Sequence, residues 1–376
     1  MPAQLRTAIV GCGKVTDLHA AAFKNLKSSR FTAVCSRSGE KAAEYAARYG
    51  VKGYTDVPEM VTKEKIDVVS ICTPHPFHRQ PTQEALASGA HVLVEKPFAS
   101  TLEDCDAMLE ASRTHDKKIG VICQRRWYPP ARRVKEAIDS GKIGTPVFGT
   151  VNMLGWRDKD YYDSDPWRGT WPGEGGGILV NQAPHQLDLL QWYMGEIEDL
   201  YGLWSNLNHP YIEVEDTANA ILKFKNGAVG NIIVSNSQKP GIYGKVHVHG
   251  ENGASAGVQT DGGAMFIAGM SNILEPPVND LWTIPGEEKM LEEWKRQDSE
   301  FFLSLENPME YFHERQIEDF LDSVAEGREP SITGEQGRVT VEIFTAIYRS
   351  TRDKKPVTWP LKPEAGKDFD GRLQNT

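Results

Sequence analysis

The sequence contains no apolar run that approaches the length of about eighteen residues expected of a membrane-spanning helix. It also lacks a basic excess: 42 lysines and arginines stand against 52 aspartates and glutamates, a formal net charge of −10, which argues against nucleic acid or an anionic membrane as a partner. The N-terminal stretch has neither the charged nor the apolar segment of a secretory signal. We therefore expect a cytoplasmic protein that binds neither nucleic acid nor a membrane.

Cysteine is scarce and shows no pairing pattern. The five cysteines lie in the first third of the chain, and none forms a C-x-x-C pair. This predicts reduced thiols, with no disulfide framework and no zinc site. His247 and His249 form an H-x-H pair for which no third metal ligand is evident, so we expect no metal centre there either.

The first 125 residues alternate short apolar segments with segments of helical spacing. Near-continuous apolar strands separated by helices predict a parallel sheet covered on both faces. The expected strands are "LRTAIVG", "FTAVCSR", "IDVVSICTP", "HVLVEKP" and "KKIGVICQ".

From about residue 146 the pattern changes to longer segments with alternating polarity. Two alternating runs flank Asn226-Gly227, a strong hairpin signal. The sequence thus predicts an α/β protein with an N-terminal domain over residues 1–126. It predicts a second domain over residues 127–376, α+β in character, with a large and mostly antiparallel sheet.

The first strand is followed directly by a glycine turn that opens a helix, "VGCGKV". Gly11 and Gly13 would let the backbone approach a pyrophosphate, with Lys14 and Val15 beside it, and the helix N-terminus favours its negative charge. The third glycine position of G-x-G-x-x-G is Thr16, so the motif is incomplete, and a purely structural turn is the alternative. Its position in a strand–helix series favours a dinucleotide.

The end of the second strand bears on the choice between NAD and NADP. An acidic residue there would bind the ribose 2′-hydroxyl, but the chain has Ser36, Arg37 and Ser38. Arg37 offers a planar fork for a 2′-phosphate and can also lie on the adenine face. This favours NADP(H). The alternative is a solvated loop arginine with NAD(H) bound.

The segment "HVLVEKPF", residues 91–98, places a lysine at the mouth of a buried strand. In a parallel sheet, ligands lie beyond the carboxyl ends of the strands, so Lys96 is expected near the nicotinamide. Pro97 would fix the turn, with a cis peptide as one way to do so. A pinned ammonium can polarise a substrate oxygen or move its proton, with Glu95 as counter-charge. The alternative is a lysine whose stem follows the apolar strand to reach solvent.

A third motif, "GEGGGILVNQAPHQLD", leads from glycines into a helix. Spacings of four and three would place Asn181, His185 and Asp188 on one helix face. Pro184 is best tolerated in a first helical turn, so this polar face should lie at the helix entrance. His185 suits general acid–base catalysis, whereas a lone helical histidine is more often structural.

Together these motifs resemble the glucose–fructose oxidoreductase and inositol dehydrogenase family, known as Gfo/Idh/MocA. The resemblance covers most of the chain and rests on the glycine turn, "TPHPFH", "EKP" and the helix with H-x-x-D. It implies a Rossmann domain followed by a sheet-rich domain that often builds homodimers or homotetramers. It also implies hydride transfer between a nicotinamide and a sugar, keto-sugar or inositol.

The resemblance also assigns roles to single residues. Lys96 and His185 match the family's catalytic lysine and histidine, while Asn181 stands where many members have an aspartate, so no Asp–His relay is available. His75 replaces a commoner asparagine. The remaining residues expected at the cofactor are Thr73, Pro74, His78, Glu95, Trp167 and Arg168.

The substrate is expected to meet aromatic and polar side chains, because an aromatic face with a few polar groups suits a sugar ring. Arg125, Arg126 and Trp127 follow the last strand of the first domain, and "YYDSDPWRGTW" is unusually aromatic. The residues expected at the substrate are Lys96, Arg125, Trp127, Tyr162, Arg168, Asn181 and His185, among which Tyr162, like its neighbour Tyr161, is a weaker candidate.

We thus expect an NAD(P)-dependent dehydrogenase or reductase of a secondary alcohol or ketone in a sugar, keto-sugar or inositol. Two other classes share the fold. One is an NAD-dependent glycosidase that keeps its cofactor bound, and the other is a non-catalytic regulator that senses a dinucleotide. Lys96 and His185 argue against the regulator, and net cofactor turnover would separate a dehydrogenase from a glycosidase.

Overall fold

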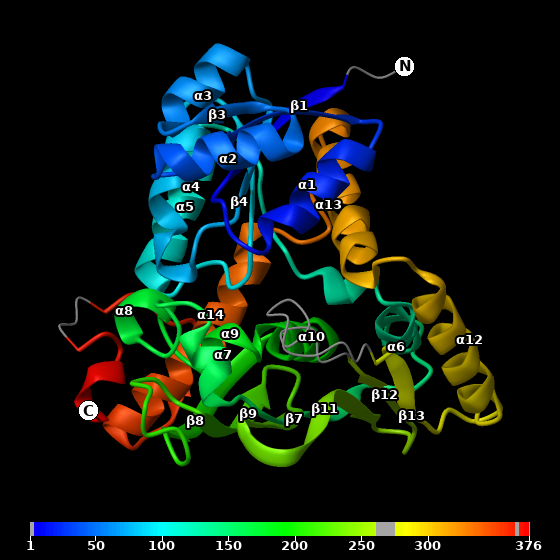
Figure 1. The fold of residues 1–376 in the computed structure, drawn as a ribbon. Coiled ribbons are helices and arrows are strands. Elements are labelled where there is room, and N and C mark those ends of the chain that lie inside the picture. The colour runs from blue at the N-terminus through cyan, green and yellow to red at the C-terminus, as the bar shows by residue number, and fades with distance from the viewer. Residues whose placement is uncertain (1–3, 261–274, 365–367, 376) are drawn as a thin grey trace. The chain divides into compact units, whose positions relative to one another are not determined.

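The computed structural model describes residues 4–260, 275–364 and 368–375. The chain forms two compact units, drawn together in Figure 1 and described separately below. The first unit combines Met1–Gln124 with Asn307–Arg338, and the second combines Arg125–Glu306 with Val339–Thr376. This division differs from the expected single boundary after residue 126, because a late helix belongs to the N-terminal unit.

The first unit is built on a six-stranded parallel sheet in the order β3-β2-β1-β4-β5-β6. This is the strand order of a dinucleotide-binding Rossmann fold. The short strand β3 was not predicted, because its three residues contain no buried apolar run. The strands are β1 Leu5–Val10, β2 Ser29–Cys35, β3 Lys52–Tyr54, β4 Val68–Ile71, β5 His91–Val94 and β6 Ile119–Val121.

Local caps fix the ends of several helices in this unit. Side-chain oxygens of Ser38, Asp56 and Thr101 accept backbone N–H groups in the first turns of α2, α3 and α5. Helix α2 ends at Gly50, whose φ of 71° is the left-handed conformation that favours glycine. The helices are α1 Thr16–Asn25, α2 Gly39–Tyr49, α3 Val57–Glu64, α4 Arg79–Ala87, α5 Leu102–Thr114 and α13 Pro308–Glu326.

Helix α13 completes the first unit, although it comes late in the chain. It lies beside α1 (Figure 1), and its Ile317, Phe320 and Leu321 are buried in the core of this unit. Gln316 binds the edge strand β6 through both ends of its amide. Its oxygen accepts the N–H of Cys123 at 2.8 Å, and its nitrogen donates to the carbonyl of Val121 at 2.7 Å.

The second unit is built on an eight-stranded sheet in the order β13-β12-β11-β7-β10-β9-β8-β14. All neighbouring pairs are antiparallel except β7 with β10. The predicted hairpin at Asn226-Gly227 is confirmed, because β9 and β10 pair around it. The strands are β7 Pro146–Trp156, β8 Ile197–Ser205, β9 Thr217–Phe224, β10 Val229–Ser235, β11 Ser237–Gly250, β12 Ser255–Gln259, β13 Val278–Trp282 and β14 Val357–Thr358.

Helix α10 packs on one face of this sheet. It lies close to β7 at Gly149, which has no side chain. A Cβ at that position would lie 2.7 Å from the Met194 side chain and 3.0 Å from that of Leu190, so a larger residue would require these side chains to shift. The helices of this unit are α6 Pro129–Asp139, α7 Lys159–Asp163, α8 Trp171–Glu174, α9 Ile178–Asn181, α10 Pro184–Met194 and α12 Met290–Ser304, with most of α14 Gly334–Asp353.

Exposed apolar side chains gather on strands β7 to β10 of the same sheet. The exposed fraction is 65% for Ile221 and 52% for Leu203, while the alternate residues of β9 are buried. Tyr201 lies opposite Ile221 in the ladder of β8 with β9, so the two side chains share a face. In the described part of the chain, no helix combines the length and the apolar character needed to cross a bilayer.

Candidate functional site

The glycine turn after β1 closes with the hydroxyl of Thr16 in place of a third glycine. Gly11 has a φ of 108°, and a Cβ there would lie 2.6 Å from the carbonyl atoms of Cys72. The Thr16 hydroxyl donates to the carbonyl of Gly11 and accepts the N–H of Gly13, both at 3.0 Å. Helix α1 starts at this threonine. The turn and the helix N-terminus thus have the form that binds a pyrophosphate.

Beyond the glycine turn, the loop after β2 meets the loop after β4. The guanidinium of Arg37 lies 5.1 Å from the centre of the Phe77 ring, and both side chains are exposed. The hydroxyl of Ser38 accepts the N–H of Lys41 and so caps α2, while that of Ser36 accepts the N–H of Ser38. Arg37 is therefore the member of this triplet whose side chain extends over an aromatic surface.

His78 braces the loop that carries Thr73 and Pro74. Its ring is fully buried, with Nε2 2.9 Å from the carbonyl oxygen of Thr73 and Nδ1 3.2 Å from that of Phe98. Burial lowers the pKa of this imidazole. Both nitrogens thus face backbone carbonyls, and the ring supports the loop that carries the half-buried Thr73 and Pro74.

Strand β5 delivers Lys96 to the carboxyl edge of the sheet, as the sequence predicts. Lys96 is half-buried, and the Lys96–Pro97 peptide bond is cis. The backbone N–H of Lys96 donates to Oε2 of Glu95 at 3.0 Å. The Glu95 carboxylate thus orients the backbone of Lys96 through this hydrogen bond.

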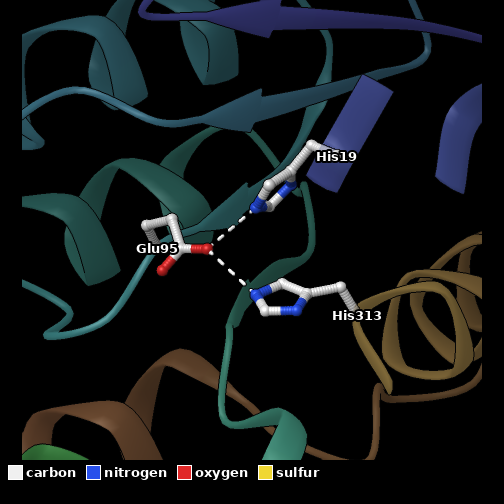
Figure 2. A group of neighbouring side chains, drawn as sticks. All are labelled: His19, Glu95 and His313. Carbon is white, nitrogen blue, oxygen red and sulfur yellow. Dashed lines mark hydrogen bonds and ion pairs between the residues drawn. The ribbon is translucent and has the colours of Figure 1, made fainter. Parts of the chain in front are cut away.

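The other oxygen of Glu95 faces two buried histidines that the sequence analysis missed (Figure 2). His19 Nε2 lies 2.8 Å and His313 Nε2 3.7 Å from Glu95 Oε1. The Nδ1 atoms face away: that of His19 lies 2.7 Å from the Ser70 hydroxyl, and that of His313 donates to the carbonyl of Met309 at 2.7 Å. The three residues come from α1, from the end of β5 and from α13.

The electrostatics of this cluster keep Glu95 ionised. Burial alone would raise the pKa of its carboxyl, but the bonds from His19 and His313 hold that pKa well below its usual range. Burial lowers the pKa of His19, and the bond to Glu95 opposes this effect. The atom types would suit a metal ion, but the 2.8 Å distance from His19 to Glu95 is that of a hydrogen bond.

In the second unit, the glycine stretch 175–177 packs against a buried carboxylate. A Cβ on Gly177 would lie 1.9 Å from the carbonyl oxygen of Glu215. The Glu215 carboxylate accepts the N–H groups of Gly177 at 2.9 Å and Leu179 at 3.0 Å, and the Tyr348 hydroxyl donates to it at 2.9 Å. The close approach of Gly177 to Glu215 leaves no room for a Cβ. The two backbone hydrogen bonds to the Glu215 carboxylate hold the start of α9.

The expected single helix with Asn181, His185 and Asp188 is interrupted in the structure. Helix α9 ends at Asn181, a turn follows at residues 182–183, and α10 begins at Pro184, as its proline predicts. The N–H of Ala183 reaches back five residues to the carbonyl of Ile178 at 2.8 Å. The spacing of four from Asn181 to His185 therefore crosses a break between two helices, whereas the spacing of three from His185 to Asp188 lies within α10. Asn181 and His185 both lie at the entrance to α10.

Asp188 belongs to an ion pair with Arg126. Its carboxylate accepts two N–H groups of the Arg126 guanidinium, at 2.8 and 2.6 Å, and both side chains are buried. Arg125, expected at the substrate, donates to the hydroxyl of Thr260 at 3.2 Å, and Gln186 donates to the same hydroxyl at 2.8 Å. Arg125 is thus linked to the residue that follows His185.

The aromatic stretch contributes Tyr161 and Arg168 to a buried network. Arg168 lies over the rings of Trp167 and Tyr161, at 4.5 and 4.4 Å, and donates to the Tyr161 hydroxyl at 2.6 Å. Asn181 Nδ2 and Gln182 Nε2 donate to the same hydroxyl at 3.2 and 2.8 Å. The predicted Trp167, Arg168 and Asn181 are thus brought together, through Tyr161.

Tyr162, expected at the substrate, lies in aromatic surroundings. Its side chain is buried, and its ring packs against those of Tyr161, His209 and Tyr211. Trp127, also expected at the substrate, is half-buried, with the Arg132 guanidinium 5.4 Å from its ring centre.

A carboxylate that the sequence analysis did not select also belongs to this network. Glu174, at the end of α8, is 1% exposed, and its Oε2 accepts the N–H of Gly169 at 2.6 Å. Asn181 Nδ2 donates to its Oε1. Burial raises the pKa of the Glu174 carboxyl to about 7, against the opposing effects of these hydrogen bonds.

Two family models match the chain. The model of the oxidoreductase family with an NAD-binding Rossmann fold matches residues 5–123, and that of the GFO/IDH/MocA C-terminal domain matches residues 131–256. The protein therefore belongs to the Gfo/Idh/MocA family of NAD-binding oxidoreductases.

Relatives of this chain include named dehydrogenases. A myo-inositol 2-dehydrogenase of Thermotoga maritima is 25% identical over 94% of this chain and 98% of its own length. A D-apiose dehydrogenase of Rhizobium rhizogenes is 28% identical over 63% of this chain and 68% of its own. The WlbA dehydrogenase of Bordetella pertussis, solved with NADH and UDP-GlcNAcA, is similar in structure: its TM-score is 0.78 at 27% identity, over 96% of this chain and 100% of that chain.

Proposed function

We propose that the protein is an NADP(H)-preferring dehydrogenase or reductase that acts on a secondary alcohol or ketone of a sugar, keto-sugar or cyclitol. The observation that carries the proposal is the position of Lys96. It stands at the carboxyl end of β5 in a Rossmann sheet, on a backbone held by Glu95. Ligands of such sheets lie beyond the carboxyl ends of the strands.

The proposed chemistry divides proton and hydride transfer between protein and cofactor. The bound nicotinamide supplies the hydride acceptor or donor at its C4 atom. In oxidation, His185 removes the hydroxyl proton and the ammonium of Lys96 polarises the same oxygen. In reduction, the same groups return the proton to the carbonyl oxygen.

The substrate class is supported by the relatives and by the residues near Asn181. Relatives are named for myo-inositol and D-apiose. Arg168, between the rings of Trp167 and Tyr161, and the amide of Asn181 offer hydrogen-bonding groups beside aromatic faces. This combination suits a polyhydroxylated ring.

The NADP preference rests on Arg37. No acidic residue follows β2 before the cap of α2, and the Arg37 guanidinium lies over Phe77. A guanidinium can bind a 2′-phosphate with two parallel hydrogen bonds, and the exposed Phe77 ring offers a flat surface for adenine. NAD(H) remains the alternative cofactor.

We also propose a cytoplasmic homodimer or homotetramer. The exposed apolar face on β8, β9 and β10 supports self-association, since a patch of this kind is typical of an interface. Its occupant is a second copy, as the family resemblance implies. The five free cysteines, four of them buried, are consistent with a reducing compartment.

The experiment that tests the function is a cofactor-reduction screen with purified protein. Sugars, inositols and their keto forms are offered with NADP⁺ or NAD⁺ and with the reduced cofactors, and absorbance of the reduced nicotinamide is followed. Net turnover with a free sugar or cyclitol is the expected result. Hydrolysis of a glycoside without net cofactor change would identify a glycosidase instead, and binding of cofactor without any turnover would identify a regulator.

A further inference from the structure

The C-terminal tail, residues 368–375, places a buried arginine against the glycine stretch 175–177. The Arg372 side chain is 0% exposed, and its Nη1 donates to the carbonyl oxygen of Gly175 at 2.6 Å. Gly175 follows α8 and has a φ of 85°, the left-handed conformation that favours glycine. The tail therefore holds the backbone at the residue where the glycine stretch begins.

The Arg372 guanidinium lies against aromatic rings of the tail and of α14. It is 4.0 Å from the centre of the Phe369 ring and 4.4 Å from that of the Tyr348 ring. A guanidinium stacks readily on an aromatic face, because it is planar and more weakly hydrated than an ammonium. These two rings thus orient the group that binds Gly175.

Two arginines of α14 hold the tail in place. Arg349 donates to Oδ1 of Asp370 through Nε at 2.9 Å and through Nη2 at 2.8 Å, and these side chains are 6% and 10% exposed. Arg352 Nη1 lies 3.5 Å from Oδ2 of Asp368. Terminal segments are usually poorly ordered unless such contacts hold them. The ion pairs therefore give Arg372 a defined position beside the glycine stretch.

Tyr348 connects the buried arginine to the start of α9. Its hydroxyl donates to the Glu215 carboxylate, which accepts the N–H groups of Gly177 and Leu179. Helix α9 has only four residues and ends at Asn181. A helix this short gains little stability from its own hydrogen bonds. Its position therefore depends on the contacts that hold the glycine stretch before it.

We propose that Arg372 is a positioning residue for substrate binding: through Gly175 it holds the segment 175–183 that leads to the entrance of α10. The proposal rests on the function proposed above, in which Asn181 and His185 at this entrance face the substrate. The glycine turn after β1 belongs to the other unit of the chain. Arg372 should therefore affect the substrate and leave the affinity for the cofactor unchanged.

The test uses Arg372→Met in the full-length chain, with Arg296→Met as the matched control. Methionine fits among aromatic rings but cannot donate to Gly175. Asp370 keeps its bonds to Arg349, so the substitution leaves no buried carboxylate unpaired. Arg296 is an arginine of the same unit whose side chain is 55% exposed. Its loss should change little, because surface ion pairs contribute little to stability.

The first measurement needs no substrate. Hydrogen exchange followed by mass spectrometry should be about 10–100-fold faster over residues 175–183 in Arg372→Met, the effect of losing one hydrogen bond from a charged group. Exchange in β9 should stay as in wild type, since the opening is local. Arg296→Met should match wild type in both segments. Unchanged exchange over residues 175–183 in a folded Arg372→Met would overturn the proposal, whether or not the protein is a dehydrogenase.

The wild-type protein decides the matter if Arg372→Met does not fold. The N–H groups of Arg372 and Leu373 donate to the carbonyls of Phe369 and Asp368, both at 3.2 Å. They should be protected from exchange as strongly as the N–H groups of residues 175–183. A tail that exchanges freely while residues 175–183 stay protected would show that the segment does not depend on Arg372, and would overturn the proposal.

The second measurement is steady-state kinetics with the substrate that the cofactor-reduction screen identifies. A segment that is correctly placed only part of the time raises the apparent dissociation constant by the inverse of the competent fraction. The KM of Arg372→Met for the substrate should therefore rise about threefold to tenfold, with kcat and the cofactor Kd close to wild type. A lower kcat with unchanged KM, or an equal loss of affinity for cofactor and substrate, would contradict a positioning role at the substrate.

Discussion

Glu95 Oε1 lies 2.8 Å from His19 Nε2, a hydrogen bond between a residue at the end of β5 and one in the first helix of the chain. The same carboxylate holds the backbone N–H of Lys96 through its other oxygen. Helix α1 begins at the glycine turn. One buried carboxylate therefore ties the segment of the proposed catalytic lysine to the helix at the proposed pyrophosphate site.

Replacing Lys96 tests its proposed part in catalysis. Lys96→Ala should keep the fold and cofactor binding but lower kcat by about 10²–10⁴-fold, the usual contribution of a general acid–base group. Steady-state kinetics and cofactor titration by fluorescence measure the two effects. Lys63→Ala, which removes an exposed lysine of the same unit, is the control. A Lys96→Ala variant within threefold of wild type would remove Lys96 from the mechanism.

The Glu95 cluster predicts a component of stability that depends on acid pH. The pKa of Glu95 is held below its unfolded value of about 4.3, so the unfolded chain binds more protons in that range. The stabilisation is fully present above about pH 4.3 and is lost as pH falls toward the lower folded pKa.

Glu95→Gln should therefore unfold at lower urea concentration at pH 7, with a loss of about 1–3 kcal/mol for the buried partners left unsatisfied. Its free energy of unfolding should also fall less steeply with acid than that of the wild type. Glu110→Gln, which changes an exposed carboxylate on α5, should behave as wild type. Parallel curves for Glu95→Gln and wild type would contradict the ionised state of Glu95.

The loop after β2 predicts a selective effect on cofactor binding. Arg37→Ala should weaken NADP binding by about 1.5–3 kcal/mol, the range for a hydrogen bond to a charged group, and leave NAD nearly unchanged. Phe77→Ala should weaken both cofactors alike, because it removes only the aromatic surface. Isothermal titration with each cofactor measures this. Tighter wild-type binding of NAD than of NADP would refute the preference.

Asn181 and His185 should differ in the kinetic constant that they affect. His185→Ala should abolish most turnover, whereas Asn181→Ala should mainly raise KM, as expected when binding common to ground and transition states is lost. Initial rates over a range of substrate concentrations separate the two. A normal kcat in His185→Ala would leave proton transfer to Lys96 alone.

The contact with Glu174 changes what Asn181→Asp should do. An aspartate there would place two carboxylates at hydrogen-bond distance in a buried site, where both cannot be ionised at low cost. We expect lower thermal stability at alkaline pH, and recovery in the double variant Asn181→Asp with Glu174→Gln. Additive losses in thermal unfolding scans would show that the two side chains do not interact.

The exposed apolar face predicts the assembly state. Ile221→Asp places a charge at the centre of that face, opposite Tyr201, and should convert the oligomer to a monomer in light-scattering measurements. Leu207→Asp changes a similarly exposed side chain, 64% exposed, in the loop after β8 and should leave the assembly intact. A wild-type protein that is already monomeric would exclude this interface.

Local patterns predicted most elements correctly because their causes are local. Continuous apolar runs marked β1, β4 and β5, and Asn226-Gly227 marked the hairpin. The incomplete glycine motif still indicated a turn between strand and helix. In the structure, the Thr16 hydroxyl hydrogen-bonds to Gly11 and Gly13 across this turn. Strand β3 and helix α12 were missed, because a three-residue strand and a largely exposed helix carry little hydrophobic periodicity.

The sequence by itself determined the class of fold, the glycine turn at Gly11, and the placement of Lys96 at a strand end. These depend on strand and helix periodicity and on backbone conformations that few residues adopt. Only the tertiary structure decided that α13 returns to the first unit, that His19 and His313 bind Glu95, and that Glu174 meets Asn181. The physical reason is that a buried charge needs a partner in space, and helix and sheet packing bring that partner from a distant segment whose spacing along the chain carries no signal.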